Sequence, residues 1–538
     1  MKLTSADLKN TRPWLEAGFT LPRFDRQAAT AATLNTPQWI HFGSGNITRA
    51  FLAALSQKLL DMGLMETGLI VVAGSDFEII DRIYEPHDNL SLLVTLKADG
   101  NIEKTVIGSI IRALKADSAA EGYQELKRFF RAPSLSMASF VITEKGYNLN
   151  GSDGELLSEV AADFAAGPAG GPSSYMARVS ALLYERYLAG AYPLALVSMD
   201  NCSRNGDRLR EAVSAFAERW ADNGKVDGNF VSYVRDHSRL SFPWTMIDKI
   251  TPRPDPAVAE MLKKTGFESA DIIVTAKNTY VAPFVNAEEC EYLVIEDDFP
   301  AGRLPLDKAG VIFTDRGTVE KIEKMKVGTC LNPLHTALAV VGCLLGFTRI
   351  NAEMADPDLR KMVEIIGYRE GLPTAVDPGI ISPKAFMEEV LNVRFPNPFI
   401  PDTPQRIATD TSQKLAPRFG GTIKAYHERP GLNASDLNLI PFVQAAWCRY
   451  LLGLDDEHKP FEISPDPRLE ELRGKLAGLE PGRPGPFHDQ LDPILSDVSI
   501  FGLNLYEAGL GQKVEALFAE MMVGPGSVRR TLHRLVAA

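Results

Sequence analysis

The chain has 538 residues, of which 45% are hydrophobic and 23% charged, a composition typical of soluble globular proteins and long enough for two large domains. Its formal net charge of −12 argues against nucleic-acid binding, which requires a basic surface, but allows a small anionic substrate at a locally positive site. The five cysteines form no CxxC motif and are odd in number, which favours a reducing compartment. We find neither an N-terminal signal-peptide pattern nor a run of about 18 apolar residues, so we expect a cytoplasmic protein without a membrane span.

The first half of the chain alternates between strand and helix patterns. Residues 1–36 show no clear period and are interpreted as an N-terminal arm, after which W-I-H-F (39–42) is a short apolar strand. Apolar residues spaced four apart from Ile47 to Leu59 predict a helix behind it. Further strands are predicted in the segments 68–76, 90–96, 139–143 and 195–199. This alternation predicts an α/β domain with a mostly parallel sheet.

After about residue 305 the pattern changes to long helices separated by proline-rich breaks. Helical periodicity is clearest over 335–347, 436–453 and 512–523. We therefore predict a first domain over residues 1–305, with its N-terminal arm, and a mostly α-helical domain over residues 306–538.

A glycine-rich turn follows the first strand. Gly43, Gly45 and Asn46 stand between strand and helix, where glycines let a backbone approach a pyrophosphate and the helix N-terminus offers free N–H groups. The third glycine of a full G-x-G-x-x-G motif is replaced by Thr48. An ordinary strand-to-helix turn is the alternative. Arg49, one turn into the helix, could contact a phosphate or be solvated.

An acidic residue ends the second strand of the predicted domain. Asp76 could accept hydrogen bonds from both ribose hydroxyls of a dinucleotide and would repel a 2′-phosphate, which favours NAD over NADP. The alternative is that Asp76 caps the following helix. Together with the glycine turn, it predicts a Rossmann-type NAD-binding domain whose cofactor-binding residues are Gly43, Gly45, Asn46 and Asp76.

A second polar group precedes an apolar helix in the second half. Lys326, Asn332 and His335 lie within ten residues, and Asn332 and His335 share one helical face. Oxidation of an alcohol by hydride transfer also requires a base; a lysine can serve when its surroundings lower its pKa, an asparagine amide can stabilise the alkoxide, and a histidine can orient the substrate. The alternatives are a capped buried helix with a solvated lysine, or a metal site with Cys330 and His335 as ligands, which lacks further ligands at a recognisable spacing.

Seven stretches in order make the chain resemble the polyol-specific long-chain dehydrogenase family, also called the mannitol dehydrogenase family. They are H-F-G-S-G-N-I-T-R-A (41–50), T-E-K-G-Y (143–147), D-N-C-S-R-N-G (200–206), F-P-W-T-M-I-D-K-I-T-P (242–252), V-I-E-D-D-F-P-A-G-R (294–303), the segment from Lys326 to His335, and Q-R-I-A-T-D-T-S-Q-K (405–414). The resemblance implies a Rossmann-type domain, a helical domain, and a zinc-independent, NAD(H)-dependent reaction in the cleft between them.

The resemblance also implies roles for individual residues. Lys326 is expected to be the catalytic base, Asn332 the donor to the alkoxide, and His335 a substrate contact. Four further residues are expected at or near the substrate: Asn201, Asp248, Arg406 and Lys414. For Asp248 the alternative is a helix or turn cap, and for Arg406 and Lys414 a solvated face.

The chain departs from the family pattern in three places. Six residues separate Lys326 from Asn332 where the family has five, and N-P-L-H replaces N-G-S-H. A one-residue bulge before Asn332 would restore the geometry; otherwise Lys324 is the alternative base. Ser75 stands where NAD-using relatives can carry a second acid, so the NAD preference depends on Asp76 alone.

The sequence around Asn332 resembles that of the hexuronate-reducing branch of the family. The implied reaction is the NAD(H)-dependent interconversion of D-fructuronate and D-mannonate, with Arg406, Lys414 and Arg204 as candidate partners of the substrate carboxylate. Reduction of tagaturonate, oxidation of mannitol or another polyol, and a non-catalytic nucleotide-binding protein are the alternatives. The oligomeric state stays open.

Overall fold

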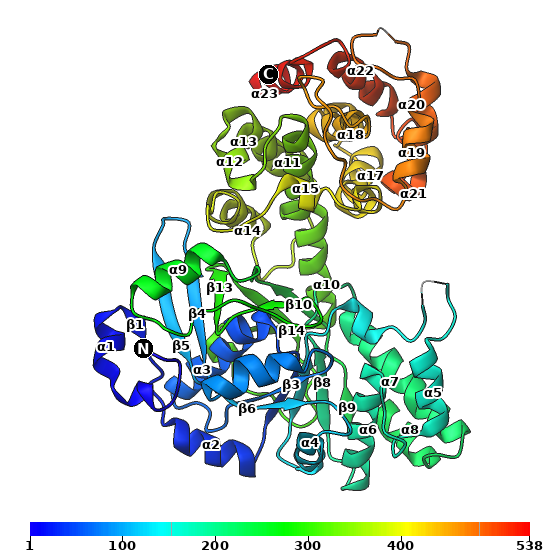
Figure 1. Ribbon diagram of the computed structural model, residues 1–538. Helices are drawn as coiled ribbons and strands as arrows, with labels where there is room; N and C mark the ends of the chain where they lie inside the picture. The colour runs from blue at the N-terminus through cyan, green and yellow to red at the C-terminus, as the bar shows by residue number, and fades with distance from the viewer. Residues whose placement is uncertain (152, 484) are drawn as a thin grey trace. The chain divides into compact units, whose positions relative to one another are not determined.

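The computed structural model describes residues 1–151, 153–483 and 485–538. The described chain divides into two compact units, Met1–Val319 and Glu320–Ala538, which Figure 1 shows in blue-to-green and green-to-red colours. The first unit is α/β and the second is helical. This is the fold class predicted from the alternation of patterns in the sequence.

The first unit is built on a six-stranded parallel sheet, within the residues described. Its strands, in spatial order, are β6 (Ile110–Lys115), β3 (Leu69–Ala73), β2 (Trp39–Phe42), β7 (Met137–Phe140), β8 (Leu194–Ser198) and β9 (Leu240–Ser241). The chain adds β3 and β6 on one side of β2 and then returns to add β7, β8 and β9 on the other. The order reverses between β2 and β7, as it does in dinucleotide-binding folds, where ligands bind at that point beyond the carboxyl ends of the strands.

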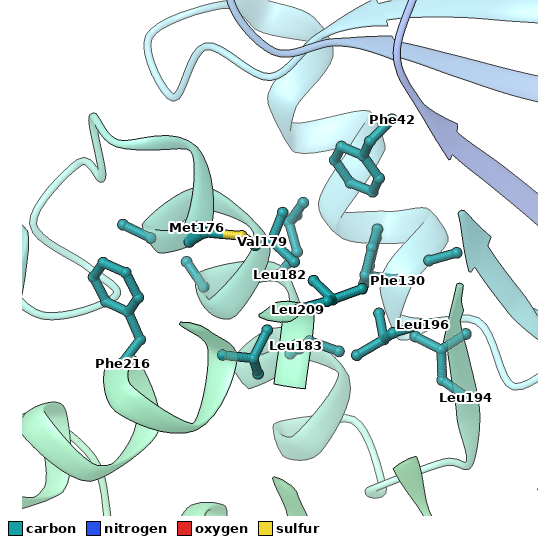
Figure 2. Packing of buried hydrophobic residues seen from close by; sticks show 14 of the residues in the cluster. Phe42, Phe130, Met176, Val179, Leu182, Leu183, Leu194, Leu196, Leu209 and Phe216 are labelled. Carbon is teal, nitrogen blue, oxygen red and sulfur yellow. The ribbon is translucent and has the colours of Figure 1, made fainter. Parts of the chain in front are cut away.

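Helices cover both faces of this sheet because alternate strand residues point to opposite sides. Ile40 and Phe42 of β2 pack in one buried cluster, which also contains residues of the helices α4 (Glu121–Arg131), α5 (Ser158–Ala166), α6 (Tyr175–Leu188), α7 (Asn205–Asp222) and α8 (Gly228–Arg235). Figure 2 shows part of this cluster, with Leu194 and Leu196 of β8 facing the helices. Trp39 packs on the other face, in a cluster with α3 (Ala53–Asp61) and the π-helices η2 (Thr48–Leu52) and η3 (Ile80–Tyr84).

Smaller sheets complete the first unit. The predicted strand at 90–96 is present as β4 (Ser91–Leu96), but it pairs antiparallel with β5 (Ile102–Ile107) in a separate sheet that also holds β1 (Phe19–Thr20) and β13 (Phe284–Glu288). Residues 306–319 belong to this unit in the structure, and β15 (Ile312–Thr314) pairs with β14 (Tyr292–Glu296), which pairs with β10 (Thr245–Asp248). The remaining strands and helix are β11 (Ile273–Val274), β12 (Tyr280–Val281) and α9 (Pro256–Lys264).

The N-terminal arm is folded. Residues 1–36, which show no clear period and were interpreted as an arm, contain α1 (Thr11–Glu16), β1 and α2 (Arg26–Asn35). Trp14 is buried against the rings of Phe19 and Phe267, with centroids 5.2 and 6.0 Å away. The short length of these elements explains why no period was visible in the sequence.

The second unit is a set of packed helices. The three predicted helices are present as α11 (Asn332–Leu344), α18 (Leu439–Tyr450) and α22 (Gly511–Met521), and α18 packs against both of the others. The other α-helices from residue 316 onwards are α10 (Arg316–Met325), α12 (Ile350–Ala355), α13 (Pro357–Glu364), α14 (Pro383–Glu389), α15 (Pro404–Ile407), α16 (Thr411–Leu415), α17 (Gly421–Glu428), α19 (Leu469–Lys475), α20 (His488–Leu495), α21 (Val498–Phe501) and α23 (Ser527–Ala537).

One helical stretch, Arg316–Leu344, is long and apolar enough to cross a membrane by length and composition alone. In the structure, 72% of its most apolar window is buried. A buried core helix of a soluble protein has these same properties, so the stretch is weak evidence for a membrane span.

Candidate active site

The glycine turn after β2 has the backbone geometry that its sequence suggested. Gly43 has a φ of 139°, and a Cβ atom built there would lie 2.5 Å from the carbonyl oxygen of Val141. A Cβ atom on Gly45 would meet no atom within 4 Å. The helix begins at Asn46, so unpaired N–H groups of its first turn lie beside this open space. The turn therefore has room for a phosphate group at Gly45 and a helix N-terminus to bind it.

The side chain of Asn46 holds the turn together. Its amide donates to the carbonyl oxygen of Pro252 at 2.9 Å, and its oxygen accepts from Arg49 at 2.9 Å. Arg49 is buried and also donates to the carbonyl oxygen of Ala282 at 2.6 Å. The alternative of a solvated Arg49 is thus wrong, because this guanidinium ties the helix to the strand region that follows β12.

Asp76 follows β3 and is half-buried. One of its carboxylate oxygens accepts a hydrogen bond from the Thr275 hydroxyl at 2.7 Å. Within the described chain, its other oxygen has no hydrogen-bond donor. The Thr275 contact fixes the carboxylate at the carboxyl end of β3 and leaves acceptor capacity for ribose hydroxyls.

A cavity of about 420 Å³ lies at the carboxyl ends of β2, β7 and β8, entirely within the first unit. Asn201 and Asp248, predicted near the substrate, both line this cavity. Ile47, which follows the glycine turn in the chain, and Val141, which follows β7, line it as well. Asp248 is a buried residue at the end of β10, whereas Asn201 is exposed. The structure thus brings these two residues together beside the point where the strand order reverses.

Asp200, which the sequence reasoning passed over, organises the same edge of the sheet. Its carboxylate accepts from the backbone N–H groups of Ile142 and Thr143 and from the Tyr147 hydroxyl at 2.5 Å. Burial raises its pKa, although these donors oppose the shift. Thr143 is held at a φ of 63°, which is costly for a β-branched residue. In the sequence, the position of Asp200 just after the predicted strand at 195–199, in the stretch D-N-C-S-R-N-G, was the signal that could have identified this residue.

The segment around Lys326 contains the one-residue insertion that the spacing required. Lys326–Cys330 is a π-helix, η7; Leu331 follows with non-helical backbone angles (φ −126°, ψ −63°), and α11 begins at Asn332. A π-helical turn holds one residue more than an α-helical turn, so it accommodates an extra residue between Lys326 and Asn332. Lys326 is buried, at 4% exposure, whereas the side chain of Lys324 is 61% exposed and pairs with Glu320 at 3.0 Å. Burial therefore favours Lys326 over Lys324 as the functional lysine.

Asn332 and His335 lie on the first turn of α11. Within the described residues the Asn332 side-chain amide makes no hydrogen bond, and its backbone carbonyl accepts from the Thr336 hydroxyl at 3.0 Å. His335 packs on Phe395, with ring centroids 5.0 Å apart, and its Nε2 atom lies 3.4 Å from Asp402. The Asn332 amide is thus available to a ligand, and the imidazole has a fixed orientation.

Four cationic side chains of the second unit act on His335: Arg394, Arg406, Lys414 and Arg418. Burial and these positive charges lower the pKa of His335 to about 3, so the imidazole is neutral at physiological pH. Asp402 does not reverse the shift because its carboxylate is already paired with Arg406. This cationic cluster makes the surroundings of His335 attractive to an anion.

The two basic residues predicted near the substrate belong to this cluster but differ in environment. The side chain of Arg406, on α15, is 65% exposed. Lys414, on α16, is half-buried and donates to the carbonyl oxygens of Ile407 and Thr409. Burial and the charge of Arg418 lower its pKa. Arg394 and Arg418 were missed by the sequence reasoning, since neither lies in a stretch that was singled out.

The geometry does not favour the metal alternative. Burial raises the pKa of the Cys330 thiol to about 12, so the thiolate that a metal prefers is disfavoured. Over the described ranges, no group of three or more His, Cys, Asp and Glu side chains is placed to hold a metal ion.

The sheet order, the glycine turn and Asp76 define a dinucleotide-binding domain, joined in one chain to a helical unit with a buried lysine. Comparison with known families gives the same result. Residues 37–308 match the mannitol dehydrogenase Rossmann domain, and residues 318–519 match the mannitol dehydrogenase C-terminal domain. The chain belongs to the mannitol dehydrogenase family, which confirms the resemblance found in the sequence, and it is a dehydrogenase of that family.

Individual relatives cover nearly the whole chain. A D-mannonate oxidoreductase of Thermotoga maritima is 50% identical over 538 residues, which cover 100% of this chain and 99% of the relative. A mannitol 2-dehydrogenase of Pyrenophora tritici-repentis is 32% identical over 81% of this chain and 73% of the relative. Among solved structures, the mannitol 2-dehydrogenase of Pseudomonas fluorescens in complex with NAD and D-mannitol superposes with a TM-score of 0.71 at 26% identity, covering 100% of both chains. A substrate-free D-sorbitol dehydrogenase gives 0.80 at 25% identity, covering 97% of this chain and 99% of the other.

Two alanine substitutions separate the two functions of the glycine turn. Gly43→Ala should destabilise the protein by about 1–3 kcal/mol, because it combines a positive φ with a backbone collision. Gly45→Ala should leave the melting temperature unchanged and weaken NADH binding, because its methyl group enters the space for the phosphate. Thermal unfolding and NADH titration by fluorescence measure the two effects. Unaltered NADH affinity in Gly45→Ala would contradict this assignment of the open space.

The buried neutral His335 should make stability depend on pH. Its pKa is about 3 when folded and near the ordinary 6.5 when unfolded, so below about pH 6.5 the unfolded chain binds a proton that the folded chain does not. Stability should therefore fall as the pH drops from about 7 to 5, at up to about 1.4 kcal/mol per pH unit from this group. Melting temperatures of His335→Asn should fall less steeply over this range. His427→Asn, at an exposed position, is the control and should follow the unmodified protein.

Proposed function

We propose that the protein is an NAD(H)-dependent oxidoreductase that interconverts D-fructuronate and D-mannonate. The observation that carries this proposal is the cationic cluster around His335, close in the chain to the buried Lys326. A neutral polyol gives no reason to gather four positive side chains, whereas a sugar acid does. The D-mannonate oxidoreductase of Thermotoga maritima, similar over the full chain, supports the same substrate.

The first unit would bind the cofactor. The helix N-terminus behind Gly43 and Gly45 would hold the pyrophosphate, and the free oxygen of Asp76 would accept from the ribose. Asn46 would act through the shape of the turn, since its side chain is occupied by Pro252 and Arg49. When bound, NADH supplies the hydride. NAD in the similar mannitol 2-dehydrogenase structure supports this choice of cofactor.

The second unit would supply the proton chemistry. In the reducing direction, the C5 carbonyl oxygen of D-fructuronate would accept a hydrogen bond from the Asn332 amide and one from the neutral His335. As the carbon receives the hydride, the developing alkoxide would take a proton from the Lys326 ammonium group. In the oxidising direction the neutral lysine would remove that proton. A protonated lysine is regenerated from solvent, so no metal-bound water is needed.

The other predicted residues would surround the substrate. We assign Arg406 and Lys414 to its charged end because both act on His335. Asn201 and Asp248 share a cavity of the first unit, which supports a role for both in binding the substrate. The use of NAD(H) and the five cysteines, which form no disulfide among the described residues, fit a cytoplasmic location.

The non-catalytic alternative rested on the extra residue between Lys326 and Asn332. The π-helix η7 removes its main support, because the insertion is accommodated within the helix and Lys326 stays buried. Tagaturonate differs from fructuronate only in stereochemistry, so a substrate panel has to separate these two hexuronates.

The purified protein should oxidise NADH when D-fructuronate is added, followed by absorbance of the reduced nicotinamide. We expect a higher kcat/KM for D-fructuronate than for tagaturonate, and only weak activity with D-fructose, which has no carboxylate. No oxidation with any of the three would refute the enzymatic proposal, and a preference for D-fructose would refute the hexuronate.

Lys326→Ala tests the acid/base, and Lys324→Ala is the matched control. Loss of the proton donor should lower kcat by about 10²- to 10⁴-fold with NADH binding intact, because general acid–base groups contribute that much. The exposed Lys324 should be replaceable with little effect. The opposite result would move the catalytic role to Lys324.

A further inference from the structure

Arg418 lies on a helical segment that packs against the segment carrying the proposed acid/base group. It is part of the π-helix η11 (Ala416–Gly420), which packs against η7, the segment that begins with Lys326. Its guanidinium donates to the hydroxyl of Thr336, and that hydroxyl donates to the backbone carbonyl of Asn332. These two bonds place the Arg418 head group along the first turn of α11, next to the residues assigned to the carbonyl.

The charge of Arg418 has no partner within the described chain. Arg406 pairs with Asp402, and Lys414 donates to two backbone carbonyls, but Arg418 forms no ion pair there. Burial lowers its pKa to about 10, still well above neutrality, and no acidic group offsets this shift. A half-buried cation without a carboxylate is costly, and a bound anion would remove that cost.

The separation of the groups suits a hexuronate. In D-fructuronate, four carbon–carbon bonds separate the C5 carbonyl from the C1 carboxylate, about 5 Å in an extended chain. Asn332 and Thr336 are four residues apart on α11, which corresponds to about 5–6 Å along the helix surface. A substrate whose carbonyl lies at Asn332 can therefore place its carboxylate at the guanidinium that Thr336 holds.

We propose that Arg418 binds the carboxylate of the sugar-acid substrate and is the residue that selects hexuronates over neutral polyols. The inference rests on the proposed function and deepens it. Thr336 occupies only one side of the guanidinium, so the remaining N–H groups can bind the carboxylate in a bidentate manner. Arg406 and Lys414 would add to the positive field without this direct contact.

The test compares two ligands of the same shape, D-mannonate and its neutral amide, D-mannonamide. We would measure their affinities by calorimetry with the NAD-saturated protein. The unmodified protein should prefer D-mannonate, and Arg418→Met should lose about 10- to 100-fold of D-mannonate affinity, with little change for the amide. A purely structural role for Arg418 would weaken both ligands equally.

Two further variants complete the test. Arg418→Lys keeps the charge without the planar fork and should have an intermediate preference. Arg429→Met, at an exposed arginine on the end of α17, is the control and should bind both ligands as the unmodified protein does. If Arg418→Met does not fold, Arg418→Lys becomes the deciding variant, and its D-mannonate affinity must fall several-fold. Unaltered affinity in that variant overturns the proposal.

Turnover separates this inference from the proposed function. If the unmodified protein reduces D-fructuronate and Arg418→Met keeps both its kcat/KM and its ligand preference, the role of Arg418 is refuted and the proposed function stands. If the unmodified protein reduces no hexuronate, the proposed function is refuted by that result alone. With the proposal correct, the loss in Arg418→Met should appear mainly in the KM for D-fructuronate, with the KM for NADH unchanged.

Discussion

The helical unit depends on one electrostatic constraint: several positive side chains share a partly buried space around a histidine that stays neutral. Concentrating like charges in such a place costs free energy, and each charge needs compensation. Asp402 compensates Arg406, and carbonyl oxygens compensate Lys414. The positive charge that remains uncompensated creates a positive electrostatic field at the first turn of α11. The function follows from this imbalance, because a ligand that brings a carboxylate completes the charge pairing.

Much of the fold was predictable from the sequence because its signals are local. Apolar runs predicted β2, β3 and β8. Helical periodicity predicted the helix over residues 47–59, which contains α3, and separately α11, α18 and α22. The partners of the strands were not predictable. Residues 90–96 have the composition of a strand in either sheet, and their pairing with β5 is decided by contacts along the whole unit. The N-terminal arm was missed because its elements are too short to show a period.

The candidate site was predictable to the extent that it lies in recognisable stretches. Lys326, Asn332 and His335 were found together, and the structure places them on consecutive helical segments. Arg418 and Arg394 could not be found this way. An arginine on a surface and an arginine beside a histidine look alike in a sequence, and only tertiary packing, such as that of η11 on η7 for Arg418, distinguishes them. Likewise, the structural role of Arg49 depends on a carbonyl of Ala282, which is distant in the chain.

The π-helix at Lys326–Cys330 has an evolutionary consequence. Adding one residue to an α-helix normally rotates everything beyond it by about 100°, which would turn the buried face of α11 outwards. A π-helical turn confines the insertion to a single turn, so the rest of the helix keeps its packing against α18. A lineage could therefore gain or lose this residue in one mutational step without losing the fold. Such a step would displace Lys326 relative to Asn332 by a small amount while the buried face of α11 stays in place.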